Sequence, residues 1–168
     1  MLFLLEFINI LLTIIVLGVI FSREFAINEI IYWSKIAGLS VISHEVMHKV
    51  VAEVLGYSTY YEVFYPGLLI GLLFKVLKSP FVFFIPGYVE IYGYIDYLHF
   101  IIISLAGPVS NGVITVLGWL FYKKTNRIEY RHLYRINFLL FILNMLPIPP
   151  LDGFKVVYGV YKVLVEVG

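Results

Sequence analysis

The chain of 168 residues contains no cysteine, so it can form neither a disulfide nor a thiolate metal site. Charged residues are also scarce, at 14% of the chain against about 25% in an average soluble domain. Aspartate occurs only twice, as Asp96 and Asp152. With 12 lysines and arginines and a net charge of +1, the chain lacks the basic stripe that binds nucleic-acid phosphates. We therefore exclude a nucleic-acid partner.

Hydrophobic residues make up 61% of the chain, and 18% of all residues are aromatic. A chain this short buries only part of its surface when it folds. It cannot hide so much apolar surface from water, so lipid must cover the remainder. This composition excludes a soluble enzyme domain and a disordered protein, and it predicts a protein embedded in a membrane.

Four apolar segments are candidates for spanning the bilayer, which takes about 20 residues in a helix. They are Leu2 to Phe21, about Ile30 to Leu55, Leu98 to Tyr122, and the segment from about Leu133 onward. A break at Pro147, Pro149 and Pro150 interrupts the fourth, and helix can resume from Gly153 to Val167. The first segment lacks the basic start of a signal peptide, so we expect a retained helix. We predict an all-α polytopic membrane protein that forms a single domain over residues 1–168.

The stretch between the second and third segments has a different pattern. Gly67 to Leu77 is apolar but too short to span a bilayer, so we predict a short re-entrant or interfacial helix. Ser79 to Tyr94 is rich in Phe, Val, Ile and Tyr and is punctuated by Pro and Gly, which favours a β-hairpin. Non-helical backbone at membrane depth is stable only when it is buried in protein or lines a wet cavity. A hairpin there would therefore border a site.

Basic residues gather in the loops that follow the first and third segments. Arg23 and Lys35 lie in or near the first of these loops. The second holds Lys123, Lys124, Arg127, Arg131 and Arg135. With four spans these loops share one face, and the positive-inside tendency places that face in the cytoplasm. We expect a multi-pass protein of the cell membrane.

The second segment contains His44-Glu45-Val46-Met47-His48. Four residues advance a helix by one turn plus about 40°, so both imidazoles project from one face. At this spacing two ring nitrogens can bind one Zn²⁺ while Glu45 acts as a base beside them. The alternative is a pair of histidines that bond to neighbouring helices. Ionisable residues at membrane depth are costly and usually functional, which favours the metal site.

A zinc hydrolase also requires a third protein ligand and an open position for water. Asp152 follows the proline-rich break, which stops a continuous helix and allows a side chain to turn into the bundle. Glu90 is a weaker candidate, and Asp96 with His99 would lie at the membrane interface. Glu53 is nine residues from His44 and so points to the opposite side of the helix. Without the histidine motif, the break would indicate only a kink at the membrane surface.

The third segment contains Ala106-Gly107-Pro108-Val109-Ser110-Asn111-Gly112. Small residues let helices approach closely in lipid, and an asparagine can hydrogen-bond across the interface. We predict that Gly107 and Gly112 lie against the helix that carries the histidines and that Asn111 lies near the site, where it could contact substrate. The alternative is a packing seam without a role in chemistry.

Together these motifs resemble the site-2 protease family of intramembrane zinc metalloproteases. The resemblance rests on the histidine motif, on Ala106 to Asn111, and on Asn144-Met145-Leu146-Pro147-Ile148-Pro149-Pro150-Leu151-Asp152-Gly153. It extends from roughly Ile30 to Tyr158. Pro86-Gly87-Tyr88-Val89 is also similar to the family's strand segment. We find no stretch long enough for the PDZ or CBS domain that many members carry.

The resemblance implies a role for each matching residue. His44, His48 and Asp152 would bind one zinc ion per chain, and Glu45 would activate the water. Asn144 would help to hold the developing oxyanion, while Asn111, Tyr88 and Val89 are candidates for contact with substrate. The implied activity is hydrolysis of peptide bonds within or near transmembrane segments of other proteins, as in regulated intramembrane proteolysis. The implied partners are a transmembrane-protein substrate and the lipid bilayer.

Two other functions use the same residues. A zinc or proton transporter would tend to show two related halves, and the chain has no such repeat. A catalytically silent membrane adaptor would have no need of Glu45. The sequence predicts neither the substrate nor the oligomeric state.

Overall fold

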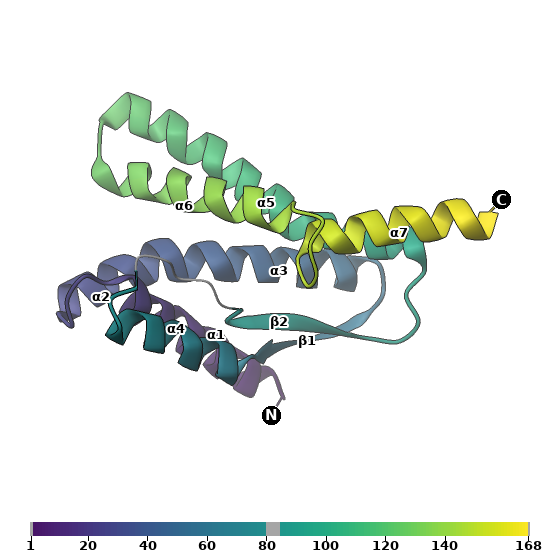
Figure 1. Ribbon diagram of the computed structural model, residues 1–168, viewed down its shortest axis with the longest axis horizontal. Helices are drawn as coiled ribbons and strands as arrows, with labels where there is room; N and C mark the ends of the chain where they lie inside the picture. Colours follow the sequence, from purple (N-terminus) through teal and green to yellow (C-terminus); the bar gives the residue numbers. More distant parts are fainter. Residues whose placement is uncertain (1, 80–84, 168) are drawn as a thin grey trace. The chain divides into compact units, whose positions relative to one another are not determined.

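A computed structural model describes residues 2–79 and 85–167 of the chain, and helices dominate it (Figure 1). The elements in chain order are α1 (Leu2–Phe21), α2 (Ile27–Trp33), a π-helical turn (Ser34–Gly38), α3 (Leu39–Val54), β1 (Ser58–Val63), α4 (Tyr65–Val76), β2 (Gly87–Tyr92), α5 (Tyr97–Thr125), α6 (Ile128–Asn144) and α7 (Asp152–Val167). The largely helical prediction is confirmed. The third predicted helix ends later and the fourth begins five residues earlier than expected. Of the basic residues predicted in the loop between them, Lys123 and Lys124 therefore lie in α5, Arg131 and Arg135 lie in α6, and Arg127 is left between the helices.

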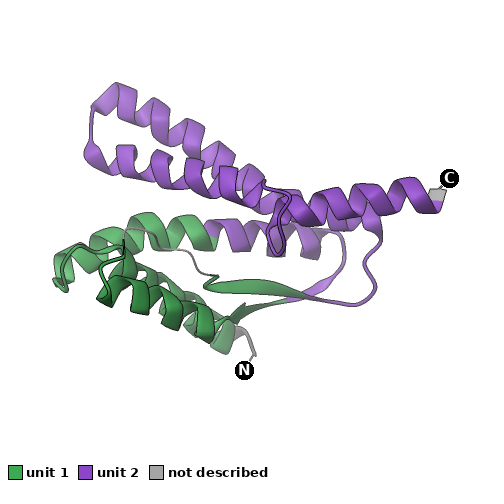
Figure 2. Cartoon of the chain, viewed as in Figure 1, with its two compact units in different colours: residues 1–42, 60–90 green, residues 43–59, 91–168 purple. Residues whose placement is uncertain are grey.

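The chain divides into two compact units (Figure 2). The first comprises residues 1–42 and 60–90, and the second comprises residues 43–59 and 91–168. The division falls within α3, β1 and β2, so both units share these elements. The expectation that residues 1–168 act as a single domain stays a prediction.

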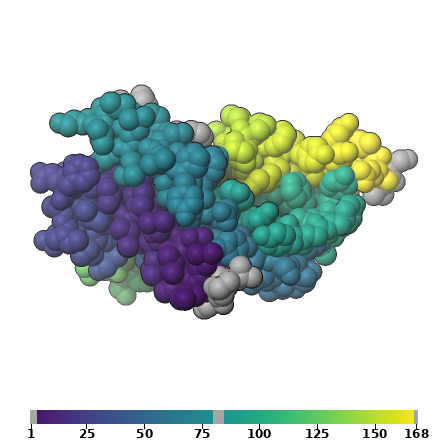
Figure 3. Space-filling model, turned by 90° about the horizontal axis from the view of Figure 1, so that it is seen from below, coloured from purple at the N-terminus to yellow at the C-terminus, as the bar shows by residue number. Residues whose placement is uncertain are grey.

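In the first unit, α1 packs against α2, the π-helical turn and α4. Figure 3 shows α1, in purple, beside α4, in teal. Close approach depends on glycine at two points. A Cβ on Gly18 would stand 2.6 Å from the carbonyl oxygen of Ile30, and one on Gly38 would stand 2.8 Å from that of Ile14. Small residues at these positions allow the backbones to meet.

Three buried polar residues, Glu6, Asn9 and Thr13, follow one face of α1 at spacings of three and four. Glu6 Oε1 accepts the backbone N–H of Tyr61 at 2.8 Å, and the Tyr61 hydroxyl donates to Thr13 Oγ1 at 3.1 Å. Asn9 Nδ2 donates to the hydroxyl of Tyr60 at 3.3 Å. These bonds fasten α1 to β1 and satisfy an N–H on the edge of that strand.

Strands β1 and β2 form a two-stranded sheet. The backbone N–H of Phe64 donates to the carbonyl of Pro86 at 3.0 Å, which joins the end of β1 to the start of β2 and makes the pair antiparallel. Hydrogen-bonded and non-bonded pairs alternate in such a ladder, so this register places Tyr61 opposite Val89 in a non-bonded pair. In a non-bonded pair both N–H groups point outward. The N–H of Tyr61 points away from β2 to Glu6, and the N–H of Val89 points away from β1.

The strand predicted in Ser79 to Tyr94 is confirmed at β2, whose partner among the described residues is β1, and the hairpin itself stays a prediction. Strand β1 lies on the other side of α4 in the chain, and the predicted short helix at Gly67 to Leu77 is confirmed as α4. Residues 80–84 of the predicted hairpin lie outside the described residues. Side chains alternate along β1 as expected for a strand, with Tyr61 and Val63 buried.

Two of the described helices are long and apolar enough to cross a membrane, with spans at Leu4–Phe21 in α1 and Tyr97–Thr125 in α5. The other two predicted spans are not among them: α6 has 17 residues, and α3 has 16 but continues directly from α2 and the π-helical turn. Helix α5 has 29 residues and is about 43 Å long at 1.5 Å per residue, longer than a hydrocarbon core of about 30 Å. Membrane association thus rests on two helices.

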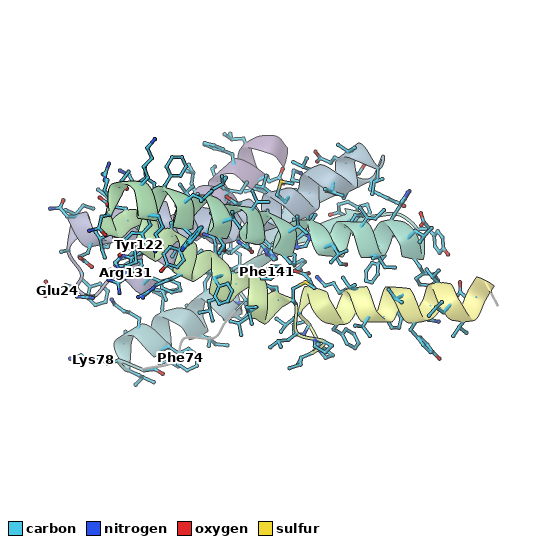
Figure 4. All side chains as sticks on the ribbon, turned by 90° about the horizontal axis from the view of Figure 1, so that it is seen from above. Glu24, Phe74, Lys78, Tyr122, Arg131 and Phe141 are labelled. Carbon is cyan, nitrogen blue, oxygen red and sulfur yellow. The ribbon has the colours of Figure 1, made fainter. Side chains whose placement is uncertain are left out.

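The second unit is built around α5, which packs along α6 and α7. The α5–α6 hairpin turns at Asn126, whose φ of 54° is in the left-handed region that asparagine tolerates. Figure 4 shows Tyr122 and Arg131 at this end of the hairpin, with Phe141 farther along α6. Asp96 caps the start of α5 by accepting the His99 N–H at 3.0 Å, and this bond lowers the pKa of the Asp96 carboxyl.

Two glycines test the close approach of α1. In Gly18→Ala, the new Cβ would overlap the carbonyl of Ile30, so we expect destabilisation by about 1–3 kcal/mol. Gly112→Ala is the control, because its Cβ would stand 3.6 Å from the ring of Phe141 in ordinary contact. Thermal unfolding in detergent should show a lower Tm for Gly18→Ala alone. Equal Tm values for both variants would contradict the packing of α1.

Candidate metal centre

The second unit brings three acidic and imidazole side chains together from α3 and α7. His44 Nε2 lies 3.0 Å from Asp152 Oδ2, and His48 Nε2 lies 3.2 Å from the same oxygen. The two Nε2 atoms are 3.1 Å apart. All three residues are buried, with relative exposures of 4–7%. This grouping is the ligand set that the sequence predicted.

Hydrogen bonds to the opposite ring nitrogens determine where the histidine lone pairs point. His48 Nδ1 lies 2.6 Å from the carbonyl oxygen of Ile103, which only accepts, so Nδ1 carries the proton and Nε2 the lone pair. His44 Nδ1 lies 2.6 Å from Asn111 Oδ1, also an acceptor. Two lone pairs and a carboxylate oxygen therefore converge in a buried space. Such an arrangement is stable only around a positive charge.

The geometry of these three atoms fits zinc. With Zn–N bonds of about 2.0–2.1 Å and tetrahedral angles, neighbouring ligand atoms are about 3.3 Å apart. The observed separations are 3.0–3.2 Å. Two histidines and one carboxylate form a common set for catalytic zinc, in which water or substrate takes the fourth position. Histidines that donate their second nitrogen to a carbonyl are also typical of zinc ligands.

The turn between α6 and α7 places Asp152 beside the histidines. It is the first residue of α7, after the turn that follows α6. A Cβ on Gly153 would overlap the carbonyl oxygens of Met145 and Leu146, so only glycine allows α7 to start this close to the end of α6. Lys155 donates to Asp152 Oδ1 at 2.8 Å, while Oδ2 faces the histidines. The carboxylate thus presents one oxygen to the metal position.

Gly107 and Gly112, both predicted to lie against the helix that carries the histidines, have different neighbours. A Cβ on Gly107 would overlap Nε2 of His48 and stand 2.7 Å from Nε2 of His44, so this prediction is confirmed. For Gly112 it is wrong, because a Cβ there would meet Phe141 of α6. Five residues advance about 140° round a helix, so the two glycines point in different directions.

The remaining predicted residues occupy varied positions. Glu45 is half-buried on α3 and interacts electrostatically with both histidines and with Asp152. Asn111 is fully buried and bonds to His44, so the contact that it makes is with a predicted ligand, and its contact with substrate stays a prediction. Asn144 is half-buried at the end of α6. The exposed Tyr88 and half-buried Val89 lie in β2 of the first unit.

Comparison with known proteins adds a second line of evidence. The chain is 32% identical over 160 residues to a protein of Methanocaldococcus jannaschii named "Putative zinc metalloprotease", covering 90% of this chain and 82% of the relative. The chain belongs to this family of zinc metalloproteases. A protein of the same description from Bacillus subtilis is 28% identical over 71 residues, which is 34% of this chain and 32% of the relative. No family model and no solved structure matches the chain.

Membership of this family makes the chain a metalloprotease, and the buried ligand group supports Zn²⁺ as its cofactor. Sequence reasoning missed three groups that hydrogen-bond to the predicted ligands of the metalloprotease or to Asn111 beside them. They are the Ile103 carbonyl, the Lys155 ammonium and the side chain of Asn137, which bonds to Asn111. A backbone carbonyl has no sequence signal, but Lys155 lies one helical turn after Asp152 and could have been predicted from that spacing.

Gly107 provides a test of the ligand geometry. In Gly107→Ala, the added Cβ would displace the Nε2 atoms of His44 and His48, so we expect zinc affinity to fall at least tenfold. Gly112→Ala on the same helix should bind zinc as the wild type does. Zinc content after dialysis against a chelator measures both. A stoichiometric Gly107→Ala protein would show that the two nitrogens are not the ligands.

Proposed function

We propose that the chain is an intramembrane zinc endopeptidase of the site-2 protease type. Its substrates are the transmembrane segments of other proteins, cleaved within or near the bilayer in regulated proteolysis. The observation that carries the proposal is the burial of the ligand group beside α5, since a Cβ on Gly107 of that helix would touch both histidines. Helix α5 is itself long and apolar enough to cross a membrane.

The composition supports a multi-pass arrangement. Many large apolar side chains are exposed on the described helices, and water would not tolerate so much exposed apolar surface. Four spans through α1, α3, α5 and α6 would place these side chains in lipid. The span at α3 would be completed by α2 and the π-helical turn, and the shorter α6 would be accommodated by local thinning of the bilayer. In this arrangement the basic loops lie in the cytoplasm.

Each residue of the site has its own role in the proposed hydrolysis. His44, His48 and Asp152 would hold the zinc ion, which when bound polarises the scissile carbonyl and lowers the pKa of a coordinated water towards about 7. Glu45, which interacts electrostatically with both histidines, would accept the proton of the attacking water and pass it to the leaving amine. Asn144 donates a hydrogen bond to the oxygen on which negative charge develops.

A transmembrane substrate is helical, so its peptide bonds are shielded and it must unwind before it is cleaved. Strand β2 is suited to receive the unwound segment by β-strand addition. Its partner edge is occupied by β1, and α1 covers the far edge of β1 through Glu6. The N–H of Val89 points to the other side of β2, where a substrate strand would pair.

Glu45→Gln tests the chemistry. The amide cannot accept the water proton, so we expect cleavage of a single-span membrane protein to fall by about 10²- to 10⁴-fold while zinc content stays at one per chain. Glu53→Gln is the matched control, because Glu53 is on the same helix but pairs with Lys49 and Thr59. Cleavage in detergent or proteoliposomes, with zinc analysis of the same samples, measures both variants. Undiminished cleavage by Glu45→Gln would reject the proposal.

Val89→Pro tests strand addition. Proline removes the outward N–H of Val89 without removing a ladder bond to β1, so we expect slower cleavage, unchanged zinc content and little change in Tm. Tyr88→Pro is the contrast: Tyr88 lies in a hydrogen-bonded pair, so proline there should disturb the sheet and lower the Tm. Normal cleavage by Val89→Pro, and likewise by Ile91→Pro, would show that substrate does not pair with this edge.

A further inference from the structure

A line of hydrogen bonds runs from the backbone of α6 to a zinc ligand on α3. His44 Nδ1 lies 2.6 Å from Asn111 Oδ1 on α5. Asn111 Nδ2 donates to Asn137 Oδ1 on α6 at 2.8 Å, and Asn137 Nδ2 donates to the Leu133 carbonyl at 2.9 Å. Both asparagines have a relative exposure of 0%. Buried amides of this kind cost free energy unless they are hydrogen-bonded, so each bond constrains the next.

The direction of every bond in this line follows from its far end. A backbone carbonyl only accepts, so the Asn137 atom that faces Leu133 is the amide nitrogen. The Asn137 oxygen then faces Asn111 and takes a proton from its amide nitrogen. This orientation turns Asn111 Oδ1 towards His44, whose Nδ1 must carry the proton. His44 Nε2 is left with the lone pair that binds a metal.

We infer that Asn137 is a positioning residue that acts through Asn111 to hold His44 in the tautomer that binds zinc. This inference rests on the zinc site of the proposed function. Asn137 lies on a helix that contributes none of the three ligands. Its effect on the metal therefore passes through the Asn111 amide. Loss of Asn137 removes an acceptor that favours the observed orientation of this amide, so the orientation rotated by 180°, which presents a donor to His44 Nδ1, becomes more populated. That rotation would put the His44 proton on Nε2 and block the metal.

A purely structural role for the two amides leads to a different expectation. Asparagine pairs stabilise helix contacts in lipid by hydrogen bonding alone. In that case their orientation would not matter to His44, and the loss of Asn137 would lower the Tm without changing zinc affinity. His48 offers a useful contrast, because its Nδ1 bonds to the backbone carbonyl of Ile103 and is fixed whatever happens at Asn137.

The test compares two substitutions of Asn137 in the full-length protein in detergent. Asn137→Leu keeps a similar volume but removes the acceptor for Asn111, so we expect zinc affinity to fall about 10- to 100-fold, as for other groups that orient ligands. Asn137→Asp should restore affinity to within about threefold of the wild type. A buried aspartic acid stays protonated, so it can donate to the Leu133 carbonyl and still accept from Asn111. Zinc dissociation constants come from competition with a chelator, without substrate.

We call the line of hydrogen bonds from Asn137 through Asn111 to His44 the relay. Two further variants distinguish loss of the relay from a general disturbance of the fold. Thr115→Val removes a hydrogen bond to the backbone of Asn111 but leaves the relay intact, so it should bind zinc normally. Asn111→Leu should lose as much affinity as Asn137→Leu. The double variant should lose no more than either single one, because both act at the same proton of His44. Replacing both amides with apolar groups also keeps the protein folded if Asn137→Leu alone does not fold.

The outcomes are distinct from those that test the protease. Wild-type protein that binds no zinc would overturn the proposed function and the relay together. Normal zinc binding by Asn137→Leu, in wild-type protein that binds zinc, would overturn the relay alone. A further loss on adding Asn137→Leu to Asn111→Leu would also overturn it, since the effect would then bypass Asn111. Cobalt substitution gives a second readout, because the visible spectrum of bound Co²⁺ changes with ligand geometry.

Discussion

Repulsion among three hydrogen-bond acceptors is the constraint on which the second unit depends. His44 Nε2, His48 Nε2 and Asp152 Oδ2 lie within about 3 Å of one another in a buried space, where the low dielectric strengthens electrostatic interactions. Without a cation these three atoms would repel one another. The packing of α3, α5 and α7 around them therefore depends on the metal that the site would hold. Gly107 allows α5 to approach the two rings, and Gly153 allows α7 to start where Asp152 reaches them.

The same constraint explains how the ligands are supported. Each Nε2 can offer its lone pair only if Nδ1 keeps the proton, and the chain achieves this in two ways. His48 bonds to a backbone carbonyl, which needs no particular side chain at Ile103. His44 bonds to Asn111, an amide that can rotate, and so a second amide at Asn137 is needed to fix its orientation. Because His44 is oriented by side chains, a substitution on α6 can change its tautomer. The tautomer of His48 depends on a backbone carbonyl and does not change with such a substitution.

The sequence predicts contacts well where helical periodicity determines them. Four residues place His44 and His48 on one face of α3, and the scarcity of aspartate made Asp152 stand out as a third ligand. The same arithmetic could have placed Gly112 correctly, since five residues turn it away from the direction of Gly107. Contacts between distant segments were harder. The strand β1 pairs across α4, and the bond from Asn111 to Asn137 joins two helices whose relative rotation periodicity alone does not give.

Most of the buried polar side chains of this apolar chain fall into two sets, and each set holds another part of the structure in place by hydrogen bonds. In the second unit they hold ligands, and in the first unit Glu6, Asn9 and Thr13 hold the strand that contains Tyr61. Glu6 lies inside a helix apolar enough to span a membrane, where a polar side chain without a hydrogen bond would be costly. Its acceptance of a strand N–H closes one edge of the sheet. Among the described residues this leaves the outer edge of β2 for a further strand, so the polar stripe of α1 would determine which edge the proposed substrate uses.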